Sequence, residues 1–211
     1  MNPRFQKIAI ALVAVLLIVP LGVVGMQQLF PKQEASAPAD PDDTRPAVDP
    51  ASQPQKPELD KPDAPAAMTK QSGKGATATV RYLLAAYPYM MSSGDTSVWE
   101  PNIDPNCQVC VTFVANAKQL DKQGGYLVDG EFDTGKADFT GKGKPPVSGE
   151  VTLKFTEAEG TLVDDPTRPA QTLPEVDGTL TAQVAWDGKA WRVGDMSLEV
   201  DDPSVIPGQG G

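Results

Sequence analysis

Two cysteines, Cys107 and Cys110, are the residues of this 211-residue chain whose types and spacing most clearly suggest chemistry. The chain has no other cysteine, and a spacing of three on a helix places both side chains on one face, close enough to form a disulfide. An exported chain with two cysteines usually pairs them. We therefore predict a structural disulfide that fastens the start of a helix, with a modest effect on stability because the closed loop is short.

Two other states of the cysteine pair stay open. A Cys-x-x-Cys sequence at a helix N-terminus can serve redox chemistry, because the helix dipole stabilises a thiolate there. The intervening Gln108-Val109 differs from a thioredoxin-type pair, however, and no strand–helix–strand pattern precedes it. The remaining alternative is two reduced, buried thiols that pack as small apolar side chains.

The chain contains no histidine, which excludes Ser-His-Asp and Cys-His catalysis and any zinc site that uses histidine. Two cysteines cannot complete a four-thiolate zinc site either. Residues 141–144 (GKGK) resemble a phosphate-binding loop, but the Ser or Thr and the helix that should follow are missing, so we expect a hairpin loop. The sequence thus predicts no catalytic residues, no metal ligands and no cofactor.

An enzyme would need an acid or base inside a pocket, and the candidates are Asp104, Glu131 and Tyr82. No spacing pairs these residues, and the alternation of apolar and acidic residues around Glu131 places it on the solvent face of a strand. Trp99 and Trp186 would anchor a partner if they were exposed, although core or rim packing is the commoner role of tryptophan. An extracytoplasmic enzyme with a carboxylate and a tyrosine in its pocket is kept as an alternative hypothesis.

Helices are predicted first along the folded part of the chain. Apolar residues at helical spacing indicate a helix over residues 77–91, which Pro88 should kink or end before Gly94. Asp104-Pro105 is typical of a helix start and predicts a second helix that carries both cysteines and stops at Gly124-Gly125.

Strands are predicted after these helices, because the apolar pattern changes from a period of 3.6 to a period of 2. Alternation over residues 126–133, 151–156, 179–186 and 191–200 indicates about four antiparallel strands with one solvent face, and residues 164–178 should form a long loop. Helices followed by strands predict an α+β fold, with N-terminal helices packed on a curved antiparallel sheet.

The last hairpin has the clearest local signal. Asp187-Gly188 suits a two-residue turn, which would pair Val184 with Trp191 and Ala182 with Val193. Residues 196–200 carry their apolar side chains on the opposite parity. We therefore predict a β-bulge near Gly194, which would return them to the core.

The N-terminal segment predicts the location of the protein in the cell. Residues 8–26 carry no charge and are long enough to span a bilayer as a helix, while Arg4 and Lys7 precede them. We expect a basic cytoplasmic N-terminus (1–7), a transmembrane signal-anchor (8–30) and a single-pass protein of the cell membrane with its domain outside the cytoplasm. Secretion after cleavage near Gly25 is the alternative, because Val23-Val24-Gly25 offers small residues at a suitable spacing.

The next segment is rich in proline. Residues 31–67 hold nine prolines and almost no large apolar residues, so residues 31–75 are predicted to be a disordered linker that keeps the domain at a distance from the membrane. The extracytoplasmic domain should then occupy residues 76–203, followed by a flexible tail, residues 204–211.

The charge of the domain limits its partners. Residues 76–211 carry ten cations and twenty acids, which argues against nucleic acid because phosphate binding needs clustered Lys and Arg. The same acidity should repel an anionic lipid surface, and its simplest role is solubility.

One set of residues carries a resemblance to a known family: Tyr82, Tyr87, Tyr89, Gly94-Asp95-Thr96, Asp104-Pro105-Asn106-Cys107, Cys110 and Trp191-Arg192-Val193. The run of residues 80–110 resembles the start of a domain of unknown function found in exported, lipoprotein-type actinobacterial proteins. The likeness covers residues 76–200, and the closing strand is similar to that of nuclear transport factor 2-like cone folds, which the family shares. Members often carry a lipid-bearing signal cysteine, which this chain lacks, and the family has no established activity to carry over.

Together these patterns predict a membrane-tethered, extracytoplasmic binding or accessory module of the cell envelope that is not an enzyme. Its expected partners are the membrane, through the N-terminal helix, and either an envelope protein or a small-molecule ligand. A subunit of a membrane-associated envelope complex, whose transmembrane helix makes contacts of its own, is a further alternative.

Overall fold

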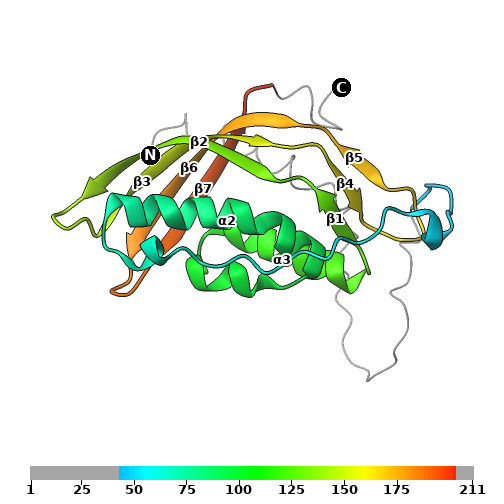
Figure 1. Ribbon diagram of the computed structural model, residues 1–211, viewed down its shortest axis with the longest axis horizontal. Helices are drawn as coiled ribbons and strands as arrows, with labels where there is room; N and C mark the ends of the chain where they lie inside the picture. The colour runs from blue at the N-terminus through cyan, green and yellow to red at the C-terminus, as the bar shows by residue number, and fades with distance from the viewer. Residues whose placement is uncertain (1–42, 203–211) are drawn as a thin grey trace, which may run out of the picture.

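The computed structural model describes residues 43–202, which form a mixed α+β fold with helices packed on antiparallel sheets, as the sequence predicts. Helices come first along the chain and strands follow (Figure 1). The predicted cytoplasmic N-terminus, membrane segment and C-terminal tail, and residues 31–42 of the predicted linker, lie outside the described residues. Within residues 43–202, no helix combines the length and the apolar character needed to cross a bilayer.

Helix α2 (Gly73–Ser93) begins where Ser72 accepts a hydrogen bond from the backbone N–H of Gly75, and it ends at Gly94, whose φ is 75°. Of the two predicted effects of Pro88, a kink or an end of the helix, the end does not occur, because α2 continues to Ser93. Pro88 is buried, so the packing of its ring offsets the backbone hydrogen bond that proline cannot form.

Helix α3 (Gln108–Lys122) starts later than Asp104-Pro105 predicts. Asp104 instead accepts a hydrogen bond from the backbone N–H of Asn106, and Cys107 takes the N-cap position. The predicted end is confirmed, because Gly124 follows α3 with a φ of 75°. Four short 3-10 helices precede or connect these two helices: η1 (Pro50–Ser52), η2 (Ala66–Thr69), η3 (Thr96–Val98) and η4 (Glu100–Asn102).

Within residues 43–202, seven strands, rather than about four, form two antiparallel sheets. The larger sheet has the order β2-β3-β6-β7 and the smaller sheet the order β1-β4-β5. The strands are β1 (Tyr126–Asp129), β2 (Phe132–Lys142), β3 (Ser148–Glu157), β4 (Gly160–Val163), β5 (Gln171–Leu173), β6 (Val176–Trp186) and β7 (Trp191–Val200).

The extra strands arise because three long strands bend and change sheet. After two residues β1 leads into β2, β3 into β4 and β5 into β6. The β1–β2 bend uses positive φ angles at Asp129 (60°) and Gly130 (81°). The predicted loop over residues 164–178 therefore contains β5 and the start of β6. Strands as short as β5 carry too few residues to show a period of 2, so their sequence resembles a loop.

The β6–β7 hairpin confirms the predicted bulge and corrects the predicted register. Trp186 pairs with Trp191 and Val184 with Val193, because the loop spans residues 187–190 rather than two residues. The Asp187 carboxylate stabilises this wider loop by accepting hydrogen bonds from the backbone N–H groups of Lys189 and Ala190. The register shifts beside Gly194, so the apolar residues beyond it return to the core.

The core lies between the two helices and the sheets. Figure 1 shows α2 and α3 together on one side of the arched strands, and aromatic rings fill the space between them. The ring of Tyr87 lies 5.4 Å from that of Phe113 and 5.6 Å from that of Phe132, measured between ring centroids. Trp99 is fully buried and donates its indole N–H to the backbone oxygen of Leu83, while Trp186 is half-buried beside Trp191. Both tryptophans therefore pack in the core or at its rim.

The described part of the predicted linker is not disordered. Residues 43–72, here called the strap, run from the β4–β5 turn along the domain to the start of α2 (Figure 1). Met68 is its one buried apolar side chain, and its other contacts with the domain are polar: strap side chains form ion pairs and hydrogen bonds, and strap backbone oxygens accept hydrogen bonds. The lack of large apolar residues predicted disorder, but these polar contacts hold the strap on the domain.

Candidate functional site

The structure joins Cys107 and Cys110 in a disulfide, with their Cα atoms 5.2 Å apart. Both residues are almost fully buried, and the Cys107 Sγ accepts a hydrogen bond from the backbone N–H of Cys110 at the first turn of α3. A redox-active pair needs at least one sulfur that a thiol can reach. Burial of both sulfurs thus favours a structural disulfide.

We expect the double substitution Cys107→Ala/Cys110→Ala to lower the free energy of unfolding by about 2 kcal/mol, the loop entropy of a very short bridge. The native protein should also react with a maleimide only after reductant and denaturant are added together, because the sulfurs are buried. Urea unfolding and thiol counting test these expectations. Rapid reduction of the folded protein by glutathione would instead indicate a redox-active pair.

The structure does not bring the predicted acid–base candidates together. The Tyr82 hydroxyl donates to the backbone oxygen of Pro62 in the strap, and the Asp104 carboxylate closes its own turn. Glu131 is exposed at the β1–β2 bend. Among the contacts of residues 43–202, none joins two of these three side chains.

A carboxylate that the sequence did not single out lies in an environment that suits acid–base chemistry. Glu157, at the end of β3, is half-buried and pairs in register with Phe132. Burial raises the pKa of Glu157 to about 7, so it holds a proton at mildly acidic pH. Burial also raises the pKa of Tyr87, with a further contribution from the nearby Glu157 charge. Glu157 closes an alternating strand, and no sequence signal separates it from the exposed acids nearby.

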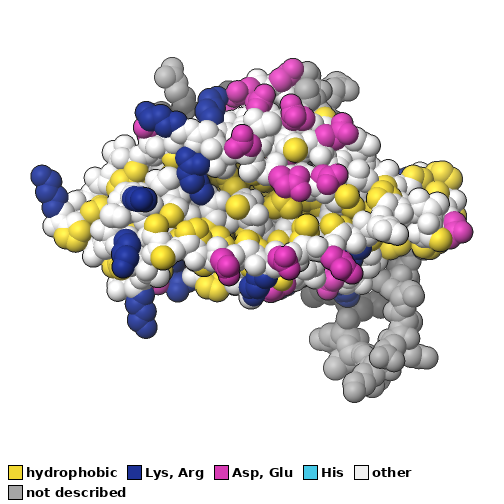
Figure 2. Space-filling view, viewed as in Figure 1, with side chains coloured by type: hydrophobic (Ala, Val, Ile, Leu, Met, Phe, Trp, Pro, Cys, Tyr) yellow, Lys and Arg dark blue, Asp and Glu magenta, His cyan; other side chains and the backbone are white. Residues whose placement is uncertain are grey.

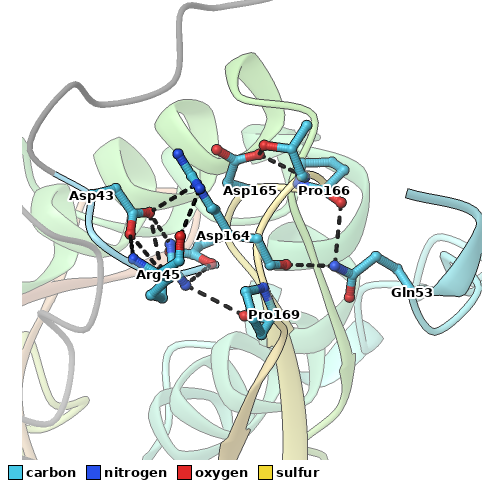
Figure 3. Close-up of polar contacts among 9 residues, drawn as sticks. Asp43, Arg45, Gln53, Asp164, Asp165, Pro166 and Pro169 are labelled. Carbon is cyan, nitrogen blue, oxygen red and sulfur yellow. Dashed lines mark hydrogen bonds and ion pairs between the residues drawn. The ribbon is translucent and has the colours of Figure 1, made fainter. Parts of the chain in front are cut away.

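The densest polar network joins the strap to the β4–β5 turn (Figure 3). Arg45 donates from Nη1 to Asp164 Oδ1 at 2.9 Å and from Nη2 to Asp164 Oδ2 at 2.7 Å, a bidentate ion pair. The Asp164 side chain is only 5% exposed. Arg45 also binds Asp43 through Nε and Nη2, and Arg168 reaches the same Asp43 carboxylate at 3.7 Å. We call these four residues the strap junction.

Charge at the strap junction is balanced between two arginines and two acids. Hydrogen bonds from the Arg45 side chain lower the pKa of Asp43 to about 2. Hydrogen bonds to Asp164 and then to Asp43 raise the pKa of Arg45. Sequence reasoning missed this network, and the one available signal was a lone arginine among the prolines of the supposed linker.

Further contacts hold the strap along its length. Gln53 Nε2 donates to the backbone oxygens of Pro166 and Arg168 (Figure 3). Tyr126 donates its hydroxyl to the backbone oxygen of Pro54. Lys61 forms an ion pair with Asp95 at 3.0 Å. The strap backbone then passes so close to α2 that a Cβ on Gly75 would lie 2.1 Å from the Lys70 oxygen. The strap is thus an integral part of the domain.

The outer face of the larger sheet holds a shallow depression of about 380 Å³ beside the Gly194 bulge. Lys142 and Glu150 lie on it, and Glu150 accepts a hydrogen bond from Gln183 at 2.6 Å. In the described residues, no group of three or more acid or cysteine side chains could hold a metal ion.

Comparison with known proteins supplies a family but no activity. No curated protein matches this sequence. The crystal structure of the intermembrane space region of the chloroplast protein ARC6 is similar over 61% of this chain and 97% of that chain, with a TM-score of 0.43 and 12% identity. An uncharacterised protein with a cystatin-like fold from Caulobacter vibrioides is similar over 61% of this chain and 92% of that chain, with a TM-score of 0.39 and 11% identity. A family profile matches residues 47–197, so it includes most of the strap, and the chain therefore belongs to DUF6318, a family of unknown function.

Proposed function

We propose that this protein is a membrane-tethered, extracytoplasmic binding or accessory module of the cell envelope. The uncharged segment 8–26, preceded by Arg4 and Lys7, would cross the membrane once with the N-terminus in the cytoplasm. The disulfide fits an oxidising compartment. We further propose that the helices and bent sheets form a nuclear transport factor 2-like cone, and that the family is of an exported type.

The observation that carries this proposal is the docked strap. Because the strap junction attaches residue 43 to the domain, only residues 31–42 separate the proposed membrane segment from the folded part. A chain of that length extends to about 40 Å, whereas a free linker over residues 31–75 would reach on the order of 100 Å. The domain is therefore a module on a short tether that works close to the bilayer.

Binding rather than turnover is favoured by the roles of the predicted reactive groups. Tyr82 holds the strap and Asp104 closes a turn, so both have structural partners. Aromatic side chains fill the space between the helices and the sheets, where a cone would otherwise enclose a pocket. This arrangement leaves the outer surface as the place for recognition.

An extracytoplasmic enzyme is the second candidate, and Glu157 is the observation that favours it. A carboxylic acid whose pKa lies near 7, beside a tyrosine, suits general acid–base chemistry. Any turnover assigned to this protein should then be lost in Glu157→Gln. It should be kept in Glu159→Gln, which alters an exposed acid on the same connection.

The proposed topology can be tested in intact cells with single added cysteines, because the native pair is bonded and does not react. We expect Leu59→Cys, at a strap position that is 41% exposed, to react with a membrane-impermeant maleimide from outside the cell. Gln6→Cys should react only after lysis, and both variants should stay in the membrane fraction after carbonate washing.

Two results would contradict the proposal in different ways. Labelled protein in the medium would mean that the N-terminal segment is cleaved and the domain is released. Labelling of Leu59→Cys only after lysis would place the domain in the cytoplasm. In that case Gln6→Cys and Leu59→Cys would show the same dependence on lysis.

A further inference from the structure

Three segments meet at one end of the domain, here called the hairpin end: residues 70–74, 142–148 and 186–192. The indole N–H of Trp191 donates to the backbone oxygen of Lys70 at 2.9 Å, and Gln71 Nε2 donates to the backbone oxygen of Pro146 at 3.3 Å. The backbone N–H of Trp186 donates to the backbone oxygen of Val147 at 2.9 Å. These bonds make the start of α2 and the tips of two hairpins one continuous surface.

The hairpin end is cationic in an otherwise acidic domain. Its three segments carry six cations and one acid, whereas the rest of residues 43–202 carries nine cations and 24 acids. In Figure 2 most of the Lys and Arg side chains gather toward the side where Figure 1 shows these hairpins, and the acidic side chains lie mainly over the middle of the molecule. Folding therefore concentrates positive charge that the net charge of the sequence conceals.

The lysines of this surface are also free to bind a partner. Each of the five is exposed, and none has an ion-pair partner among the described residues. Elsewhere in the described chain five of the six lysines pair with an acid. Two acids lie near the hairpin end: Asp187 pairs with Arg192, and Glu150 keeps its charge beside Lys142, so the hairpin end has a net positive charge with Glu150 included. The five lysines are Lys70, Lys74, Lys142, Lys144 and Lys189.

An apolar tip stands among these lysines. Val147 is 53% exposed, the more exposed of the two large hydrophobic side chains that project from the described surface. It follows Pro145 and Pro146 at the end of the β2–β3 hairpin, and the half-buried Trp186 lies behind it. An exposed apolar side chain on the same hairpin as Lys142 and Lys144 matches the interface of an anionic bilayer, where lysines meet phosphate groups and the apolar tip enters the headgroup layer.

We propose that the hairpin end docks the domain on the surface of an anionic lipid bilayer. This inference rests on the proposed tether, which keeps the domain close to the membrane. The strap starts at the far end of the molecule from the hairpins, so docking requires the domain to lie along the surface (Figure 1). In that orientation residue 43 also lies near the bilayer, and residues 31–42 reach about 40 Å. The tether therefore permits this orientation.

The experiment uses the full chain in vesicles that contain either neutral phosphatidylcholine alone or 30 mol% phosphatidylglycerol. An environment-sensitive fluorophore is attached at Val147→Cys or, as the matched control, at Leu59→Cys, the other exposed apolar position. We expect a blue shift and quenching by lipid-borne quenchers for the label at residue 147 in anionic vesicles only. High salt should reverse both, because exposed charges are then screened.

Charge removal gives the size of the expected effect. At roughly 5-fold per lysine, Lys142→Gln/Lys144→Gln should lower the ratio of docked to free domains about 30-fold. Lys118→Gln/Lys122→Gln, on α3 away from the hairpin end, should leave that ratio unchanged. Equal signals in neutral and anionic vesicles, or equal signals at residues 59 and 147, would overturn the proposal. So would a response to soluble polyglutamate as large as the response to vesicles, which would identify an acidic protein segment as the partner.

Flotation separates this inference from the proposed tether. If the chain floats with neutral vesicles but the label at residue 147 gives the same fluorescence in neutral and anionic vesicles, the tether stands and the docking surface is refuted. If the chain fails to float with neutral vesicles, the tether is refuted. The anionic vesicles still test the hairpin end in that case.

Discussion

Replacement of Glu157 by glutamine is expected to stabilise the protein by about 2–3 kcal/mol at pH 8 and to change its stability little at pH 4. Glutamine has the shape of the protonated acid and keeps the half-buried site neutral at every pH. The expected gain at high pH is therefore the cost of ionising Glu157 in the folded protein.

The direction of the pH effect follows from the raised pKa. The pKa of Glu157 rises from 4.5 to about 7 on folding, so the folded protein binds this proton more tightly than the unfolded chain. Its stabilising contribution is complete below about pH 4.5 and is lost as the pH rises toward 7. Above that range the cost is constant, so the two proteins should differ by the same amount at pH 8 and pH 9.

Urea unfolding of both proteins at pH 4, 6 and 8 measures this difference, and the shared effects of the other carboxylates cancel in the comparison. Glu159→Gln is the matched control, because Glu159 is exposed and its neutralisation should give no pH-dependent gain. A gain from Glu157→Gln that is the same at all three pH values would refute the assignment of the buried proton.

Replacement of Asp164 by asparagine is expected to release the strap. The change removes the charge that holds Arg45 through two hydrogen bonds and leaves the partly buried guanidinium without its main partner. We expect a loss of about 2 kcal/mol, since Arg45 keeps some solvent contact and its bond to Asp43. A protease that cleaves after glutamate should then cut the Glu58–Leu59 bond of the strap about 30-fold faster, because such cleavage follows the population of the open state.

Asp165→Asn is the matched control, because the side chain of the adjacent Asp165 accepts hydrogen bonds from Thr167 within its own turn (Figure 3). The rate of cleavage after Glu58 should stay that of the native protein. Equal protection of the strap in Asp164→Asn would show that the contacts of Gln53 and Tyr126 are sufficient to hold it. The strap would then be held on the domain without the strap junction.

A released strap would also change how the domain meets the membrane. The proposed tether would lengthen from residues 31–42 to most of residues 31–72, and the domain would spend less time near the bilayer. Docking through Lys142, Lys144 and Val147 should weaken in Asp164→Asn even though no residue of the hairpin end has changed. The vesicle experiment with the label at residue 147 can detect this coupling.

The sequence by itself determined the features whose causes lie within a few residues. The order of helices and strands, the pairing of Cys107 with Cys110, the helix end at Gly124 and the bulge at Gly194 all follow from local spacing and from the conformations that glycine permits. The bulge was predictable because the apolar residues change from one face of the strand to the other, and one extra residue in the strand returns them to the core face. The hairpin register was not, because the Asp187 side chain widens the loop through bonds to its own backbone.

Only the tertiary structure decided what the proline-rich segment does and where the charges lie. Arg45 and Asp164 are 119 positions apart, so no local pattern relates them, and other contacts of the strap use backbone oxygens, which every sequence has. The net charge predicted repulsion from anionic lipid, yet folding gathers five unpaired lysines from three distant segments at one end. The raised pKa of Glu157 likewise depends on its burial in the folded protein, near Tyr87 of α2. A sequence encodes such properties only through the contacts of its fold, because charge and burial depend on distance in space rather than on distance along the chain.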